Sequence, residues 1–501
     1  MQSLPPALAL HQCGQHRYEL SGLRTASIRD QILRAHMLAH GLHMLEDTDF
    51  RRDLPVLVVG AGAAGVEVAL TLQALGQSVV LVEANDKPFK HQRHVKTRVI
   101  DPCEYDFPHL TWRLGDMKAV PGPIPHLAFK AATPRSLAID WDLALGMAKK
   151  GIAGVAATVQ VQRNTTFDVS DLTQNPASNC EHWSGYAHPS KPRVRVGADF
   201  AAVVSTVGFS SEFTSLPSES QRDVVCRPFW ANDDLLSADL GTHGRSGRGF
   251  PKRVAKVLVS GGGDGASQDI QRVLTGLCGK ALFDRLNITL PQPELHNAML
   301  AEHEAQRAHI WTWQVGTTAA LRSPAWNWQA SAKLQHQAWH DAYEDLATAI
   351  YKSWSGNLAS RQSVLRDDVD LTWVISSSGL TYSYGLNRLL GLLVARLAAE
   401  ATGRTLKVAT GKQWQAMSAV GARPVMLYNS RVNAVAAASA HVHTGSCAHE
   451  LHNVEVKFLI DGITTTVDAV DVLVARHGVK VERLFGGAAI PEQLVPIVLP
   501  R

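Results

Sequence analysis

Short apolar runs that lead into glycine turns mark two places where buried strands are expected. The first run, Val56–Val59, is continuous and apolar, as in a strand covered on both faces of a parallel sheet. A helical pattern begins at Val66 and ends near Leu75, just before a glycine. A second apolar run then ends in Glu83. This order of strand, turn, helix and strand predicts the first part of a parallel βαβ unit.

The glycines of the first turn have a spacing that suits a dinucleotide. Gly60, Gly62 and Gly65 form a G-x-G-x-x-G motif. The first glycine permits the tight turn, the second lets a pyrophosphate approach the backbone, and the third lets the helix pack closely on the strand. The helix N-terminus offers N–H groups to the phosphates, and Glu83, 18 residues after Gly65, offers a carboxylate to ribose hydroxyls. The predicted contact residues are Gly60, Ala61, Gly62, Ala63, Ala64, Gly65 and Glu83. The alternative is a glycine-rich turn that binds no ligand.

A second loop repeats part of this pattern. The stretch "VLVSGGGDGASQD" at 257–269 places Gly261, Gly263 and Ala266 in a G-x-G-x-x-A motif after an apolar run. Two features oppose a ligand there. Asp264 puts negative charge at the helix N-terminus, where it would cap the helix but repel a phosphate. The stretch "GKALFDRLN" at 279–287 is also a weak strand that could equally continue a helix.

If 279–287 is the next strand, its end supplies further candidate contacts. Asp284 follows Ala266 by 18 residues, which is the offset between Gly65 and Glu83, and Arg285 could instead meet a 2′-phosphate. Two hypotheses stay open at this loop. It binds NAD(P)H, or it belongs to a Rossmann-like half that packs without a ligand.

Two further segments resemble each other. Residues 193–209 and 454–478 each contain an alternating strand, a glycine turn, an aspartate followed by apolar residues, and an exit that ends in glycine. The dipeptide Asp461-Gly462 is a signal for a β-hairpin. Both segments are therefore expected to contain a strand that turns at a glycine into a second, apolar strand.

Together these motifs resemble the flavoproteins with two dinucleotide-binding domains, a broad class that contains disulfide reductases and flavin monooxygenases. The order along this chain is the Gly60–Gly65 loop, the strand end Ser205–Gly208, the Gly261–Ala266 loop and the strand end Ala475–Gly478. The resemblance implies FAD on the first loop and NAD(P)H on the second, and it brings His477 near the flavin. The chain departs from the class in having "STVG" and "ARHG" where "ATG" is usual. It also has no C-x-x-C pair, so disulfide reduction by a cysteine pair is not expected.

The predicted fold is α/β, with a Rossmann-like FAD-binding domain and a second Rossmann-like domain that carries a largely helical insertion. Residues 1–53 are expected to form an N-terminal helical extension. Residues 54–210 and 405–501 are expected to form the discontinuous FAD-binding domain, and residues 211–404 the second domain. Within that domain, residues 311–354 hold six of the 12 tryptophans. We expect these rings to lie mainly in a core, with a substrate cage as the alternative.

Two polar stretches are candidates for ligand contact. The stretch after Glu83 is basic, and Arg93, Lys96 or Arg98 could neutralise pyrophosphate charge, or simply form a solvated basic surface. Of these three residues, we predict that Arg93 contacts the cofactor. The run "HVHTGSCAHELH" at 441–452 is interpreted as a polar loop, with zinc as the alternative. No metal site is predicted.

Composition narrows the class of protein. A chain of 501 residues with 45% apolar and 19% charged residues is typical of a globular protein of two or three domains. A net charge of +4 is too small to indicate a nucleic-acid partner. The six scattered cysteines, the absence of a signal-like start and the lack of a long apolar span favour a cytoplasmic protein with no membrane partner. Oligomeric state is left open.

Two functional hypotheses follow. The first is an FAD-dependent oxidoreductase in which NAD(P)H reduces the flavin, which then reduces oxygen or a small organic acceptor. The second is a non-catalytic dinucleotide-binding sensor or interaction protein built on a Rossmann scaffold. The sequence assigns no catalytic acid or base.

Overall fold

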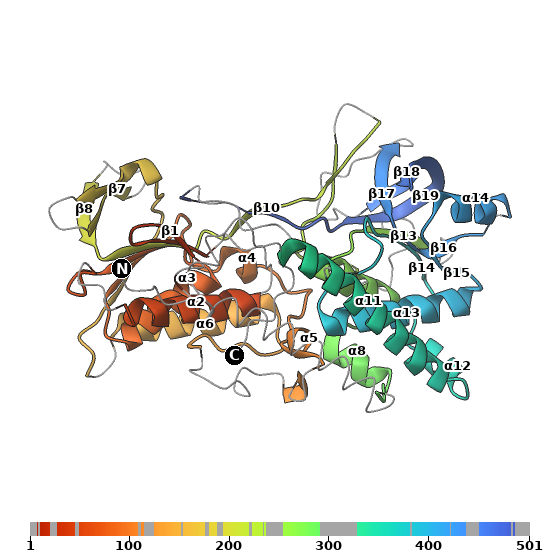
Figure 1. The fold of residues 1–501 in the computed structure, drawn as a ribbon, viewed down its shortest axis with the longest axis horizontal. Coiled ribbons are helices and arrows are strands. Elements are labelled where there is room, and N and C mark those ends of the chain that lie inside the picture. The colour runs from red at the N-terminus through yellow and green to blue at the C-terminus, as the bar shows by residue number, and fades with distance from the viewer. Residues whose placement is uncertain are drawn as a thin grey trace, which may run out of the picture.

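We analysed a computed structural model of the chain. It describes residues 8, 11–20, 28–45, 50–108, 112–114, 125–151, 154–175, 180–187, 194–219, 223–233, 235–236, 254–290, 328–380, 383–420, 422–436, 450–481 and 484–485. Two parallel sheets dominate this part of the chain, one in each half of the molecule (Figure 1).

The first sheet contains the first glycine loop. Its six strands lie in the order β1 (Gln12–Gly14), β2 (Arg17–Glu19), β9 (Ala202–Ser205), β3 (Val56–Val59), β4 (Val79–Val82) and β5 (Val159–Gln162). All neighbouring pairs except β1–β2 are parallel. β3 and β4 are buried along their whole length, as the continuous apolar runs predict.

Each face of the first sheet is covered by a different layer. Helices α2 (Ile28–His43), α3 (Ala63–Ala74) and α6 (Pro134–Lys149) lie together on one face (Figure 1). A three-stranded antiparallel sheet covers the other face, where Trp183 and Phe200 pack against Leu57 of β3. Its strands are β6 (Leu172–Asn175), β7 (Cys180–Ala187) and β8 (Val194–Phe200).

The second sheet contains the second glycine loop. Its seven strands lie in the order β15 (Thr405–Val408), β16 (Pro424–Leu427), β14 (Val369–Val374), β13 (Ala255–Ser260), β19 (Ile463–Ala475), β18 (Glu450–Ile460) and β17 (Ser430–Ala436). The first five strands run parallel to one another. The fifth, β19, also pairs with β18, and β17, β18 and β19 form an antiparallel meander. Helices α7 (Asp264–Thr275) and α13 (Gly385–Thr402) pack on each other and on this sheet.

Further helices occupy the segment between α7 and β14. They are α8 (Gly279–Arg285), α11 (Trp328–Ser353) and α12 (Leu358–Gln362), and α11 packs on α13. The remaining short elements are α4 (Lys90–Arg93), α5 (Cys103–Asp106), α14 (Gly411–Ala419), β10 (Phe209–Glu212), β11 (Ser215–Leu216), β12 (Val224–Val225) and β20 (Val479–Val481), with 3-10 turns at Trp112–Leu114 and Val169–Asp171. β10 and β20 pair with each other where the chain crosses between the two halves (Figure 1).

The expected domain boundaries need two corrections. The strands between 405 and 475 belong to the second sheet, whereas we expected 405–501 to close the FAD-binding domain. The reason is the run Val472–Ala475, whose four residues pair in register with Val257–Ser260 and so extend the centre of that sheet. At Leu484, whose N–H donates to Glu19 at 2.7 Å, the described chain contacts the first sheet again.

The second correction concerns the N-terminal extension. α2 is helical as predicted, but the preceding residues form β1 and β2, and β2 pairs with β9. The extension is therefore an edge of the first sheet as well as a covering helix.

The two similar hairpin segments differ in detail. Asp461 and Gly462 form the turn between β18 and β19 with φ values of +48° and +80°, which confirms the predicted hairpin. In the earlier segment, Gly197 lies inside β8 and the chain turns at Ala201 instead. Within the described part of the chain, no helix is both long enough and apolar enough to cross a membrane.

Candidate dinucleotide-binding sites

The first glycine loop is held against the end of β9. Gly60 has a φ of +101°, and a Cβ there would lie 2.8 Å from the carbonyl oxygen of Thr206. The Thr206 N–H donates to Val59 O at 2.8 Å, and its hydroxyl lies 2.8 Å from both the Val59 and Gly60 carbonyl oxygens. The strand end "STVG" therefore fixes the turn, and only glycine fits at position 60.

The other two glycines of this loop have opposite surroundings. A Cβ on Gly65 would lie 1.8 Å from Gly60 O, so α3 packs directly on the turn. A Cβ on Gly62 would meet no atom within 4 Å. Gly62 is the N-cap residue of α3 and provides no side-chain cap, so the helix N-terminus faces open space. An open N-terminus with no side chain over it is the surface that a pyrophosphate needs.

Glu83 lies at the end of β4, beside the loop. Its side chain is buried, with Oε2 accepting from the Ala61 N–H at 2.7 Å and Oε1 from the Asn85 N–H at 2.8 Å. These bonds fix the carboxylate next to the phosphate-binding turn. Because each carboxylate oxygen accepts more than one hydrogen bond, Glu83 retains capacity for a ribose hydroxyl. The residues of this loop therefore fit FAD.

Arg93 is engaged within the protein. It ends α4, donates to Pro88 O at 2.7 Å and pairs with Asp142 at 2.6 Å. The next residue after Pro88 is Phe89, whose N–H donates to Ala61 O at 3.0 Å. Arg93 thus supports the segment that contacts the loop, and its direct contact with a pyrophosphate stays a prediction.

The second loop has the same local construction. Gly261 has a φ of +138°, and a Cβ there would lie 2.2 Å from Arg476 O. The Arg476 N–H donates to Ser260 O at 2.7 Å, so Arg476 stands to this loop as Thr206 stands to the first. Gly263 is the N-cap residue of α7, and Ala266 is fully buried within that helix. Both loops are therefore built from a β-strand, a positive-φ glycine, a helix and a strand end from a distant hairpin.

Asp264 is the first residue of α7, directly after the N-cap residue Gly263, and its side chain also bonds outside its own helix. Its Oδ1 accepts from Asn387 Nδ2 at 2.7 Å and from the Tyr384 N–H at 3.2 Å, at the start of α13. The N-terminus of α13 and an amide therefore hold this negative charge, although it still lies in the first turn of α7.

Asp284 and Arg285 are not at the second loop. The stretch 279–287 forms α8 rather than a strand, and its apolar residues Leu282 and Phe283 pack in the core beside Phe107. Asp284 pairs with Lys280 one turn away. The strand that follows α7 in the sheet is β14, so the residue that corresponds in place to Glu83 comes just after Val374.

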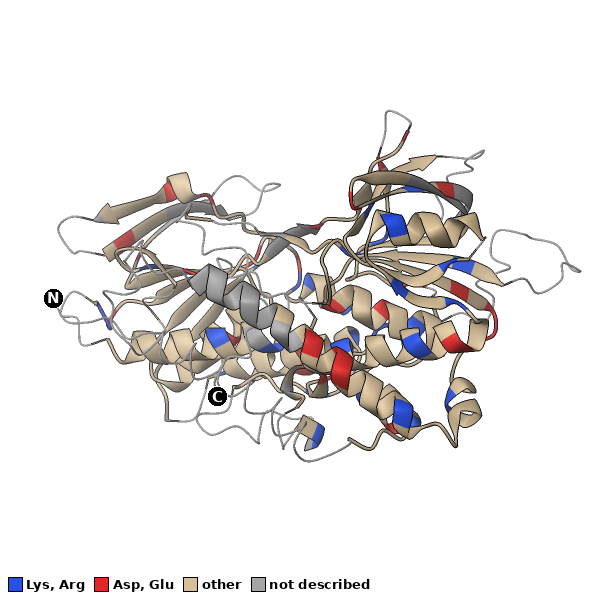
Figure 2. Cartoon of the chain, turned by 45° about the vertical axis from the view of Figure 1, so that its right-hand side comes forward, with Lys and Arg blue, Asp and Glu red and all other residues tan. Residues whose placement is uncertain are grey.

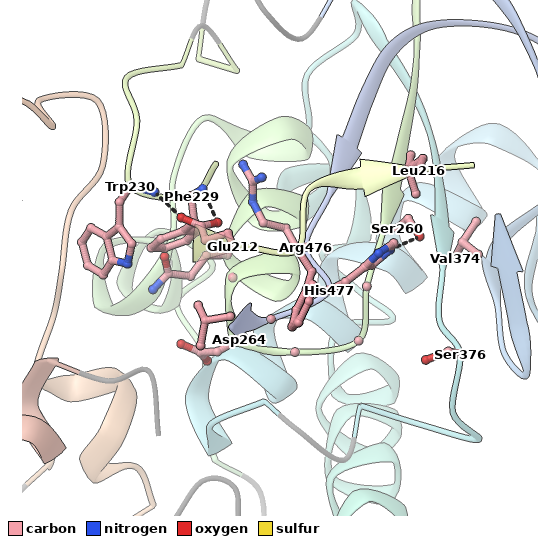
Figure 3. A pocket seen from close by; sticks show the side chains of 18 of the residues that line it. Glu212, Leu216, Phe229, Trp230, Ser260, Asp264, Val374, Ser376, Arg476 and His477 are labelled. Atoms are coloured by element: carbon pink, nitrogen blue, oxygen red, sulfur yellow. Dashed lines mark hydrogen bonds between the residues drawn. The ribbon is translucent and has the colours of Figure 1, made fainter. Parts of the chain in front are cut away.

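A cavity of about 730 Å³ lies over the second loop, between the two halves of the molecule. Gly261–Gly265 line it, together with Tyr105 from the first half and the linker residues Phe229 and Trp230. Glu212 accepts from the N–H groups of both linker residues, at 2.5 Å and 3.0 Å (Figure 3). This volume lies within the ordinary range for small-molecule and cofactor pockets.

Beneath this cavity lies a buried cluster of charges. Arg98 pairs with Asp269 at 2.7 Å and with Asp233 at 2.9 Å, and its guanidinium carbon lies 3.9 Å from the Phe229 ring centroid. Arg272 and Arg476 complete the cluster. Burial alone would raise the pKa of Asp269, but the three guanidinium groups hold that pKa well below its usual range. Three arginines against two aspartates leave a net positive charge under the second loop. Arg98, considered for the first loop, therefore lies at the second.

His477 lines the cavity next to this cluster of charges. Its Nε2 lies 2.8 Å from Ser260 Oγ (Figure 3). Desolvation and the neighbouring Arg476 charge lower the pKa of His477. The ring is therefore neutral at pH 7 and able to accept or donate a hydrogen bond at the cavity.

Sequence reasoning missed several residues that build the sites. The sequence marks Thr206 and Arg476 only as parts of strand ends, and no motif marks Phe229 and Trp230. The available signal is an aromatic pair in the segment between β12 and β13. Ile375 and Ser376 follow β14, and Ser376 lines the cavity, a place that only the identification of β14 as the strand after α7 would predict.

The remaining candidates give no further site. Among the described residues, no group of three His, Cys, Asp or Glu side chains is placed to hold a metal. The run 441–449 lies outside the described residues, so its interpretation stays a prediction. Of the tryptophans at 311–354, the described side chain of Trp354 is buried in the core. Charged residues of both signs are scattered over both halves rather than gathered on one face (Figure 2).

Comparison with known proteins gives one family match. The model of the family described as pyridine nucleotide-disulphide oxidoreductase matches residues 55–99, which contain β3, α3, β4 and Glu83. No curated protein matches the chain.

Several solved structures are similar over much of the chain, at low identity. Bacillithiol disulfide reductase Bdr (YpdA) from Staphylococcus aureus is 8% identical, with 85% of this chain and 76% of that chain covered and a TM-score of 0.37. Thioredoxin reductase from Lactococcus lactis is 8% identical, with 86% and 80% covered and a TM-score of 0.32. The complex of OTEMO with FAD and NADP is 14% identical, with 44% and 36% covered and a TM-score of 0.23. All three TM-scores lie below 0.5.

Proposed function

We propose that the chain is an FAD-dependent oxidoreductase of the superfamily with two dinucleotide-binding domains, in which NAD(P)H at its second loop reduces FAD held at its first. The reduced flavin then passes electrons to oxygen or a small organic acceptor. The observation that carries the proposal is the pair of like-built loops, one open at Gly62 and the other opening into a cavity of about 730 Å³.

The residues of the first loop would hold FAD in a defined orientation. The N–H groups at the start of α3 would bind the pyrophosphate, because no side chain covers Gly62. Glu83 would accept from the adenosine ribose, since the Ala61 and Asn85 N–H groups already orient its carboxylate. The flavin supplies the electron chemistry when bound, and the protein supplies position and electrostatics.

The residues of the second loop would hold the nicotinamide cofactor. The start of α7 would bind its pyrophosphate, and the net positive cluster of Arg98, Arg272 and Arg476 would offset the charge of the phosphates and of Asp264. Phe229 and Trp230 would exclude water from one wall of the cavity. His477 and Ser260 would exchange a proton at the wall near the strand end.

A second candidate function is a non-catalytic dinucleotide sensor. It is favoured by Asp264, which keeps a carboxylate in the first turn of α7 where a pyrophosphate would bind. In that case FAD would bind at the first loop and no nicotinamide cofactor would reduce it.

Absorbance separates these two functions. The purified protein, reconstituted with FAD, should show flavin peaks that bleach under anaerobic conditions when NADH or NADPH is added. Flavin that stays bound and never bleaches with either cofactor would favour the sensor, or an oxidase reduced directly by its substrate.

Two substitutions assign the loops. Gly62→Trp should abolish FAD binding because the indole fills the space in front of the helix N-terminus. Gly263→Trp should leave FAD bound but remove nicotinamide-dependent bleaching. Unchanged reduction kinetics in Gly263→Trp would show that the second loop binds no cofactor.

A further inference from the structure

We propose that the cavity over the second loop selects NADPH over NADH, with Ser376 and Arg431 receiving the 2′-phosphate. This inference rests on the proposed function, because it concerns the cofactor that the second loop would hold. It identifies two residues that no sequence motif marks and that lie 55 positions apart in the chain.

The end of β14 is where the adenosine ribose would lie. In a dinucleotide site of this kind, the residue after the strand next to the loop contacts the ribose 2′ position. β14 is the parallel neighbour of β13, and the Gly261 N–H donates to Val374 O at 2.9 Å. A Cβ on Gly262 would lie 2.9 Å from Ile375 Cγ2 and 3.6 Å from Ser377 Oγ. Residues 375–377 therefore border the second loop directly.

Ile375 stands at the place that Glu83 takes beside the first loop, and Ser376 is the next residue. Ser376 is exposed and lines the cavity (Figure 3). At the corresponding end of β4 the chain has Glu83, whose carboxylate accepts from the loop at Ala61 N. The Glu83 carboxylate accepts ribose hydroxyls but would repel a phosphate, whereas Ile375 and Ser376 carry no charge and the Ser376 hydroxyl can donate to a phosphate.

The acids near the cavity are held away from Ser376. Among the described lining residues, the carboxylates are those of Glu212 and Asp264. Glu212 accepts from the linker N–H groups, and Asp264 accepts from the start of α13. Figure 3 shows both of them apart from Ser376 in the cavity.

Arg431 provides the positive charge at this end. The Ser430 N–H donates to Ile375 O at 2.9 Å and the Asn429 N–H donates to Ser377 O at 3.0 Å, so the start of β17 lies beside residues 375–377. Arg431 follows directly, is exposed and lines the same cavity. No carboxylate of the described residues forms an ion pair with it. A guanidinium group binds a phosphate through two parallel hydrogen bonds, which ribose hydroxyls cannot match.

The test uses FAD-loaded full-length protein, so that the first loop is already occupied. Calorimetric titration should show that 2′,5′-ADP binds more tightly than 5′-AMP by about tenfold or more, the worth of one charge-assisted contact. Arg431→Ala should remove this difference while changing the 5′-AMP affinity little. Ser376→Glu should invert the preference, and Lys412→Ala, which removes an exposed charge on α14 outside the cavity, should leave it intact.

The outcomes separate this inference from the proposed function. Equal affinity for the two nucleotides, together with bleaching of the flavin by NADH as fast as by NADPH, overturns the selectivity and leaves the proposed function standing. Binding of neither nucleotide, with no bleaching by either cofactor, overturns both. A Gly263→Trp variant that still discriminates the two nucleotides would place their binding elsewhere and also overturn the inference.

Discussion

Replacing either of two glycines in the first loop by alanine should have opposite consequences. In Gly65→Ala, the new methyl would lie 1.8 Å from Gly60 O, where ordinary contact begins at 3.4 Å. The Gly60 carbonyl also lies 2.8 Å from the Thr206 hydroxyl, so moving it disturbs that contact. Overpacking costs about 1 to 3 kcal/mol and a lost hydrogen bond about 1 kcal/mol. We therefore expect a loss of about 2 to 4 kcal/mol in the free energy of unfolding.

In Gly62→Ala, the protein should fold almost normally and bind FAD poorly. No atom lies within 4 Å of the new methyl, and the backbone at Gly62 has φ −76° and ψ −174°, which alanine adopts readily. Its effect on stability should stay within about 1 kcal/mol, the usual size of a change at a helix N-cap. The methyl nevertheless occupies the space that the pyrophosphate needs. Loss of one charge-assisted hydrogen bond corresponds to an FAD affinity about 10- to 100-fold weaker.

Two measurements on the FAD-free proteins test the Gly65→Ala and Gly62→Ala predictions. Chemical denaturation followed by circular dichroism gives the free energy of unfolding, and quenching of FAD fluorescence gives the affinity. The reasoning is refuted if Gly62→Ala binds FAD like the unmodified chain while Gly65→Ala is as stable as that chain.

Three further substitutions test buried and cavity groups. Burial, with Arg34 adding to the effect, lowers the pKa of His11 to about 3, so between pH 6.5 and that value only the unfolded state takes up a proton. The free energy of unfolding should therefore fall by about 2 kcal/mol from pH 7 to pH 5. His11→Asn, assayed by denaturation at both pH values, should lack this decrease. Burial, with Asp264 and Asp101 nearby, raises the pKa of Glu104 well above its usual value, so the folded state keeps a proton that the unfolded state releases above about pH 4.5. The stability of the protein should therefore decline from pH 5 to pH 8, and Glu104→Gln should make the melting temperature less dependent on pH over that range. An unchanged pH dependence of the melting temperature in the variant would contradict this reasoning. His477→Gln should bind FAD normally but lose an inflection below pH 6.5 in the rate of nicotinamide-dependent flavin reduction, and an identical pH profile would remove His477 from proton exchange.

The first site could be predicted from the sequence because its parts are local. β3, the loop, α3 and β4 occupy one continuous stretch that ends at Glu83. The apolar runs are buried as their pattern indicates, and glycine is required at Gly60 and Gly65 by contacts that any such turn makes. Even Thr206, from a distant strand, was marked by the strand end that contains it.

The second site could not be predicted to the same depth because its parts are distant in sequence. The segment 279–287 was too short and too weakly apolar to distinguish a strand from a helix, and packing of Phe283 against Phe107 and Trp112 decides for a helix. With β14 starting only at Val369, the position that corresponds to Glu83 falls at Ile375, and the proposed phosphate contact at Ser376 follows it. Likewise the pairing of Arg98 with Asp269, 171 residues away, depends on how the two halves dock.

The predicted domain assignment of residues 405–501 was wrong for a related reason. The apolar run in β19 indicates a buried strand but not which of two sheets it joins. Pairing of Val472–Ala475 with β13 settles that choice, and the order of strands in a sheet is not encoded in any one segment.

The most direct test of the account is to titrate FAD into the purified apoprotein and follow bound-flavin absorbance in parallel with the Gly62→Trp variant. We predict stoichiometric uptake by the unmodified chain and none by the variant, with both proteins equally folded by circular dichroism. Failure of the unmodified protein to take up FAD, or equal uptake by both proteins, would contradict the claim that the open N-terminus of α3 binds the pyrophosphate of FAD.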